Sequence, residues 1–348
     1  MRPLVGAIRW DAWHGDKGTP GQAVQRALGP AKWHHRLPFF AQVRDDGSVA
    51  IDGARQDVMD QEIRYAVQAG LDYWAFVTYP PDTAMSLGLK LYLTSRLRTQ
   101  IRFCLVTECS RWRDPAFVSR LAKLMREPGY QTVCDGRPLL YLGFITADKL
   151  QHAWQGADGF RKVVDGLRAT ALRAGLKDPY VVVMDSNPAQ GKRWAEALGC
   201  QAISSYAAQA GGRGASYAAL ARHAEASWAR GKAIGAHVVP LCMAGWDRRP
   251  RVEHPVPWET WQKPGQGLDR FYHAPTPAEL ATHVQDALDW LRDNPAAPAR
   301  CALIYAWNEN DEGGWLVPTL AADGTPDTRR IEALGHVLRR PPAEEPRR

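Results

Sequence analysis

The chain has 348 residues, of which 45% are hydrophobic and 23% are charged, and its formal net charge is +7. These proportions are typical of globular proteins and exclude disordered, fibrous and membrane-spanning chains. The basic residues are spread along the chain and become concentrated only in its last ten residues, so we expect neither a nucleic-acid partner nor a membrane partner.

Eight short apolar runs, rich in β-branched and aromatic residues, predict strands. Their near-continuous apolarity is typical of parallel strands that are covered on both faces. No apolar leader with a small-residue cleavage site precedes the first run, so we expect a cytoplasmic protein, or a periplasmic or secreted one if a leader has been removed. The runs cover residues 4–10, 73–79, 101–108, 138–144, 180–185, 202–206, 238–244 and 302–307.

Helical patterns separate most of these runs, and several of them end at a glycine. Gly70, Gly175, Gly199 and Gly231 each follow the last periodic residue, where a left-handed cap is needed before the chain enters a strand. Repeated units of helix, glycine and strand predict a βα array. The helices are expected at residues 56–69, 115–126, 159–174, 188–198, 215–230 and 277–292.

Eight such units in one chain favour an α/β fold made of a single (β/α)₈ TIM barrel over a doubly wound open sheet. We expect one barrel domain over residues 1–338 and a disordered tail at 339–348. Enlarged loops follow the first strand, at 11–55, and the seventh, at 246–277. Loops at that end of a barrel form its active face, so these aromatic-rich insertions are expected to build a substrate cleft.

The last predicted strand runs directly into three acids. Glu309, Asp311 and Glu312 place like charges at the end of a buried strand, and their repulsion and partial burial raise the pKa of at least one carboxyl. One protonated and one ionised carboxyl is the arrangement that cleaves glycosidic bonds. Taken alone, the segment is equally consistent with acids that solvate a loop or cap a helix.

The ends of the other predicted strands also carry polar or aromatic side chains, which together predict a sugar-sized cleft. A structural salt bridge is an alternative role for Glu108 and Asp185, and hydrogen-bonded packing is an alternative for Tyr79 and Tyr206. The chain has 14 Trp, whose flat faces suit sugar rings. The candidate substrate-binding residues are Trp10, Asp11, Tyr79, Glu108, Asp185, Tyr206, Trp246, Asp247 and Arg248.

We expect no metal ion and no cofactor. The six cysteines are widely spaced, four fall in apolar runs, and no short Cys-x-x-Cys pair is present, so they are expected to be reduced core residues. His14, His34 and His35 come nearest to a ligand cluster. A His pair in a polar loop is more often a surface or sugar-contacting feature than a metal site.

Two motifs at adjacent predicted strand ends resemble a known family. The segment Trp-Asn-Glu-Asn-Asp-Glu-Gly at 307–313 and the segment Gly-Trp-Asp-Arg-Arg-Pro-Arg at 245–251 are similar to the family 99 glycoside hydrolases and their WbsX-like relatives encoded in polysaccharide loci. Weaker similarity extends to 60–74 and 135–141.

The resemblance implies a retaining, endo-acting α-mannosidase or mannanase in which the substrate 2-hydroxyl attacks the anomeric carbon. By position, Glu309 would be the base on that hydroxyl, Glu312 the general acid, and Asn308 a neighbouring hydrogen-bonding residue. Here Asn310 and Asp311 separate the glutamates, where the family usually has an aromatic or small residue first. This departure leaves the identity of the substrate open.

Two other functions compete with a retaining glycoside hydrolase that acts on a polysaccharide or oligosaccharide. One is a glycosyltransferase-associated role in a polysaccharide-biosynthesis locus, and the other is a catalytically silent, carbohydrate-binding barrel. The sequence does not determine the sugar, its linkage, endo or exo action, or the oligomeric state.

Overall fold

A computed structural model describes residues 2–339. The predicted disordered tail lies, apart from Arg339, outside the described residues. No helix within residues 2–339 has the length and apolarity needed to cross a membrane.

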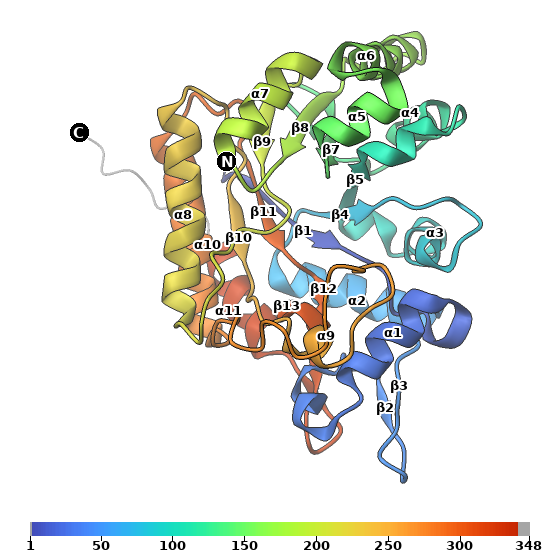
Figure 1. Cartoon of the computed structure of the whole chain (residues 1–348), viewed down its shortest axis with the longest axis vertical. Helices are drawn as coiled ribbons and strands as arrows, with labels where there is room; N and C mark the ends of the chain where they lie inside the picture. The colour runs from blue at the N-terminus through green and yellow to red at the C-terminus, as the bar shows by residue number, and fades with distance from the viewer. Residues whose placement is uncertain (1, 340–348) are drawn as a thin grey trace.

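Eight parallel strands form the barrel (Figure 1). Their hydrogen-bonded order is β10-β11-β1-β4-β5-β7-β8-β9. The ring closes where the Ile203 amide donates to the His237 carbonyl and the Val239 amide donates to the Ile203 carbonyl. The predicted (β/α)₈ barrel is therefore confirmed. The strands are β1 (Leu4–Arg9), β4 (Tyr73–Val77), β5 (Arg102–Glu108), β7 (Arg137–Gly143), β8 (Tyr180–Met184), β9 (Ala202–Ser204), β10 (Leu241–Met243) and β11 (Cys301–Tyr305).

Helices surround the ring and follow most of its strands. They are α2 (Gln56–Ala69), α3 (Leu87–Thr94), α4 (Phe117–Met125), α5 (Ala147–Trp154), α6 (Ala157–Arg173), α7 (Pro188–Leu198), α8 (Tyr217–Ala233), α10 (Pro277–Asp293) and α11 (Arg329–Leu338). The two-residue strand β6 (Thr132–Val133) pairs antiparallel with β7.

Three of the four predicted glycine caps are confirmed, because Gly70, Gly175 and Gly199 all have positive φ at helix ends. The prediction for Gly231 is wrong. Helix α8 continues to Ala233, and Gly235 has the positive φ instead. Gly231 lies inside the helix, where a Cβ atom would come within 2.8 Å of the Val238 side chain, so close packing of the helix on the next strand excludes a side chain there.

The barrel interior is filled by aromatic side chains. Tyr73 and Tyr141 share a hydrogen bond of 2.8 Å between their hydroxyls, and Tyr73 lies over Gly6, where a Cβ would come within 2.2 Å of the ring. Cys104 and Cys301 are buried in this core, and all six cysteines are free thiols. The barrel is a packed core rather than a pore, so the site lies above it at the carboxyl ends of the strands.

The two predicted insertions form a second layer over that end. The first contains α1 (Thr19–Leu28) and the hairpin of β2 (Gln42–Val43) and β3 (Val49–Ala50), and the second contains α9 (Arg249–Glu253). They pack against each other through α1 and α9, and Arg36 of the first insertion forms a buried ion pair with Asp247 of the second. Figure 1 shows α1, α9, β12 (Asn308–Glu309) and β13 (Gly314–Trp315) gathered at one side of the molecule. The insertions thus form one wall beside the last strand.

Candidate functional site

A short hairpin after β11 carries the two glutamates. It pairs β12 (Asn308–Glu309) with β13 (Gly314–Trp315), and a 3₁₀ turn at Asn310–Glu312 joins them. The turn ends at Gly313, whose φ is +82° and where a Cβ would lie 2.5 Å from the Asp247 amide nitrogen. Only glycine fits this approach, which brings the hairpin against the end of β10. Both Glu309 and Glu312 are buried there, with 3% and 7% of their surface exposed.

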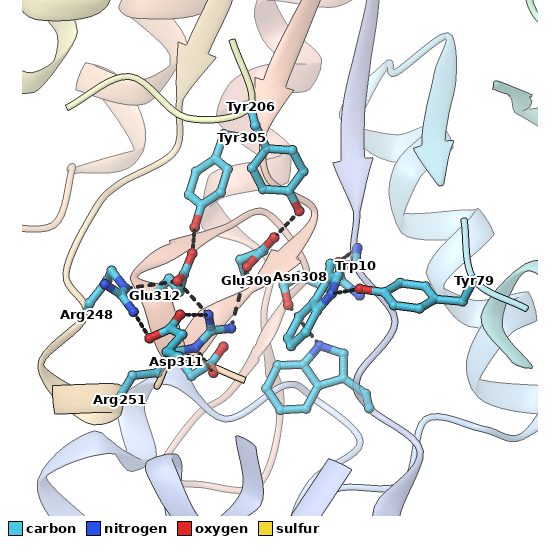
Figure 2. Close-up of polar contacts among 12 residues, drawn as sticks. Trp10, Tyr79, Tyr206, Arg248, Arg251, Tyr305, Asn308, Glu309, Asp311 and Glu312 are labelled. Atoms are coloured by element: carbon cyan, nitrogen blue, oxygen red, sulfur yellow. Dashed lines mark hydrogen bonds and ion pairs between the residues drawn. The ribbon is translucent and has the colours of Figure 1, made fainter. Parts of the chain in front are cut away.

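The two carboxyls have different partners (Figure 2). Glu312 accepts hydrogen bonds from the Tyr305 hydroxyl at 2.5 Å, from Nε of Arg248 at 3.0 Å and from Nη1 of Arg251 at 2.5 Å. Glu309 accepts a hydrogen bond of 2.5 Å from the Tyr206 hydroxyl, and Nη2 of Arg251 lies 3.7 Å from its Oε2. Glu312 is therefore held by two cations, whereas Glu309 has one distant cation and one neutral donor.

This difference separates the protonation of the pair. Burial raises the pKa of Glu309 well above its ordinary value, and the charge of Glu312 raises it further. Burial also acts to raise the pKa of Glu312, but the charges of Arg251 and Arg248 outweigh it and lower the pKa. The surroundings therefore favour the proton of the pair on Glu309 and the negative charge on Glu312. The sequence-based prediction that crowding would raise one carboxyl pKa is confirmed.

Arg251 is the counter-ion of the whole acidic segment. Its Nε donates to Asp311 at 2.7 Å, and its Nη1 atom contacts both Glu312 and Glu259. Only 4% of its side chain is exposed. Sequence reasoning did not select Arg251 as a site residue, although it is the last residue of the 245–251 motif.

Three predicted substrate-binding residues lie behind the cleft instead of in its wall. Asn308 is fully buried, and its Oδ1 accepts a hydrogen bond from the Trp10 amide at 2.9 Å. Asp11 is paired with Arg9, and burial raises the pKa of its carboxyl to about 6. Asp247 is a buried ion-pair partner of two arginines, Arg36 and Arg249. These side chains position their neighbours.

The other predicted residues converge on one open cleft of about 960 Å³, with Glu309 and Glu312 in its wall. The indole Nε1 of Trp10 donates to the Tyr79 hydroxyl at 2.7 Å, so these two aromatic side chains hold each other in place. Contact with a substrate remains a prediction for the seven predicted residues that line the cleft, which are Trp10, Tyr79, Glu108, Asp185, Tyr206, Trp246 and Arg248.

Sequence reasoning missed several residues of the cleft. Trp258 and Trp261 come from the enlarged loop after β10, and Phe144 follows β7. Their exposed fractions of 40%, 65% and 46% make them three of the most exposed large apolar side chains among the described residues. The prediction that this loop builds a cleft was the available signal for the two tryptophans. The charged residues of the cleft that were missed are Arg111, Lys149, Arg251 and Glu259.

The three histidines that came nearest to a ligand cluster do not converge in the structure. Within residues 2–339, a single group of three side chains of metal-binding type comes together, and it consists of Glu225, His283 and Asp286 on the outer helices α8 and α10.

Comparison with known proteins gives a match in fold only. No protein-family model matches the sequence, and no curated protein matches it. Two solved structures of the GH99 endo-α-mannosidase from Bacteroides thetaiotaomicron are similar to this chain. One, in complex with bis-tris-propane, has a TM-score of 0.58 at 13% identity, and the other has a TM-score of 0.54 at 12% identity. In both cases the match covers 97% of this chain and 96% of that chain, so the two folds are shared over nearly their whole length.

Proposed function

We propose that the protein is a retaining glycoside hydrolase that acts on a polysaccharide or oligosaccharide and is a distant relative of family 99. One observation carries the proposal: two buried carboxyls whose surroundings shift their pKa values in opposite directions, Glu309 up and Glu312 down, stand in the wall of an aromatic-lined cleft at the carboxyl end of a barrel. The fold shared with an endo-α-mannosidase supports the same class of reaction.

The proposed reaction uses the substrate 2-hydroxyl as the nucleophile. Glu309 takes the proton of that hydroxyl while the substrate 2-oxygen bonds to the anomeric carbon. The bond from that carbon to the leaving oxygen breaks, and Glu312 gives a proton to the leaving oxygen. Water then attacks the anomeric carbon of the 1,2-anhydro sugar and loses its proton to Glu312, and the 2-oxygen regains a proton from Glu309. Two inversions at one carbon give net retention.

The resting protonation is the reverse of the one that this sequence of steps requires. The pair holds one proton, and it must pass from Glu309 to Glu312 before the bond breaks. Arg248 gives a route for this shift, because it lines the cleft, contacts Glu312 and also pairs with Glu259. A substrate that displaces Arg248 toward Glu259 would raise the pKa of Glu312 and draw the proton to it.

A panel of α-mannans, α-glucans and bacterial polysaccharides tests the proposal through the release of reducing ends. We expect at least one member to be cleaved by the natural chain and not by Glu309→Gln. Binding without release across the panel would instead support the silent carbohydrate-binding barrel, and transfer to an acceptor sugar without hydrolysis would support a biosynthetic role.

A further inference from the structure

A second cluster of charged side chains lies across the barrel mouth from the glutamates. In the ring order, β5 is four strands from β10 and β7 is four strands from β11, which is the opposite side of an eight-stranded ring. Glu108 is the last residue of β5, Arg111 lies in the 3₁₀ turn that follows it, and helix α5 after β7 carries Lys149. All three line the same cleft as Glu309 and Glu312.

Arg111 is held in position, and much of its hydrogen-bonding capacity is free. Its guanidinium carbon lies 4.7 Å from the centre of the Tyr79 ring, and that ring is fixed by the hydrogen bond from Trp10. Its Nε is buried and has no hydrogen-bond partner within residues 2–339. Its nearest acid, Glu108, is 4.0 Å away, at the outer limit of an ion pair. A guanidinium presents five N–H donors in a planar fork, which suits two oxygens of one anion.

Lys149 adds a second positive charge, and one carboxylate serves both cations. The Lys149 ammonium donates to Glu108 at 3.1 Å and to the Phe144 carbonyl at 3.1 Å. The side chains of Arg111, Lys149 and Glu108 are 31%, 40% and 30% exposed, so the cluster is open to the cleft and carries one positive charge in excess. The next acid in this wall, Asp185, accepts a hydrogen bond from the Asn187 amide, and burial raises its pKa.

We propose that Arg111 and Lys149 form a subsite for an anionic group on the substrate, such as the carboxylate of a uronic acid or a phosphate substituent. The proposal rests on the proposed hydrolase function and adds the class of its substrate: an acidic polysaccharide whose charged unit lies away from the scissile bond. Glu108 positions the two cations. A neutral sugar would leave the Arg111 donors without a charged acceptor, whereas an anion accepts two charge-assisted hydrogen bonds from them.

Matched pairs of ligands test the subsite directly. Uronic-acid-containing oligosaccharides are compared with the same oligosaccharides after reduction of the carboxyl to a hydroxymethyl group, and phosphorylated mannan is compared with its dephosphorylated form. Calorimetry with the natural chain should show at least about tenfold tighter binding of the charged member of one pair, the size expected for a charge-assisted contact. The pair that shows the difference identifies the anion.

The variant Arg111→Gln should remove this preference by weakening the binding of the charged member about tenfold more than that of the uncharged member, and Arg111→Lys should retain part of it. Unchanged melting temperatures would show that both variants fold. Equal binding of charged and uncharged members, equal weakening of both by Arg111→Gln, or no binding of any charged member would overturn the subsite. Cleavage of a neutral polysaccharide without an acidic preference would refute the subsite alone, whereas acidic preference without cleavage of any polysaccharide would refute the hydrolase alone.

Discussion

Replacement of Arg251 by Met should destabilise the protein strongly and reverse part of its pH dependence. The side chain is 4% exposed and contacts Asp311 at 2.7 Å and Glu312 at 2.5 Å, and Asp311 itself has no exposed surface. Methionine fills a similar volume without charge, so the buried acids lose their shared counter-ion. Removal of one partner from a buried ion pair costs about 3–5 kcal/mol, and we expect a loss of that size in the free energy of unfolding near pH 7.

The direction in which the free energy of unfolding changes with pH is a second, independent test of the role of Arg251. In the natural protein the pKa of Glu312 is lowered, so its contribution to stability is present above the unfolded pKa and is lost as the pH falls. Without Arg251, desolvation loses the largest contribution that opposes it, and the pKa of Glu312 rises. The variant should therefore lose stability as the pH rises above the unfolded pKa of about 4.3, because the unfolded state releases the proton that the buried carboxyl keeps.

Urea unfolding of Arg251→Met at several pH values measures both effects. Arg249→Met is the matched control, since Arg249 belongs to the same segment but is 31% exposed. Its partner Asp247 would still form an ion pair with Arg36 in this variant. The control should lose no more than about 1 kcal/mol. A loss below about 1 kcal/mol in Arg251→Met as well, with an unchanged pH slope, would refute the view that Arg251 compensates the acidic segment.

Three further outcomes follow from the proposed roles of Glu309 and Glu312. Glu312→Gln should lower turnover of substrates with poor leaving groups by about 10²–10⁴-fold and that of activated aryl glycosides much less; if Glu309→Gln shows this dependence instead, the acid is Glu309. Tyr206→Phe should move the alkaline limb of the kcat/KM profile to higher pH, because the hydrogen bond from Tyr206 lowers the pKa of Glu309 and its loss lets the pair keep its one proton to a higher pH; an unmoved limb would count against a proton shared by Glu309 and Glu312. A 2-deoxy-2-fluoro glycoside with a good leaving group should bind without turnover or labelling, and a mass increase on the peptide that carries either glutamate would reveal an enzymic nucleophile.

The architecture could be predicted from sequence because its signals are local. A parallel strand covered on both faces is an apolar run of a few residues, and Gly70 and Gly199 mark helix ends by a conformation that other residues avoid. Gly231 shows the limit of this signal. A glycine is also used where a helix packs closely, and only the position of Val238 in space distinguishes the two cases.

The candidate site could be predicted only in part, because strand ends do not reveal where side chains point. The acids at 309 and 312 and the aromatic residues Trp10 and Tyr206 do converge on the cleft. Asn308 lies on the hairpin with Glu309, yet its side chain turns inward to the Trp10 amide.

Charge compensation is the other feature that sequence reasoning could not supply. From the sequence, the acids at 309–312 are expected to repel one another. In the structure Arg251, about sixty positions earlier in the chain, lies among them and forms an ion pair with Glu312. Arg111 and Lys149 were missed for a similar reason, since each follows a strand by several residues and meets the cleft only through the path of its loop.

The anomeric configuration of the first product tests the central claim most directly. Proton NMR would follow cleavage of whichever member of the polysaccharide panel releases reducing ends, within the minutes before mutarotation mixes the anomers. We expect the natural chain to release the anomer of the substrate, and neither Glu309→Gln nor Glu312→Gln to release it at a comparable rate. Initial release of the opposite anomer, or undiminished release by Glu309→Gln, would contradict a retaining mechanism based on this pair.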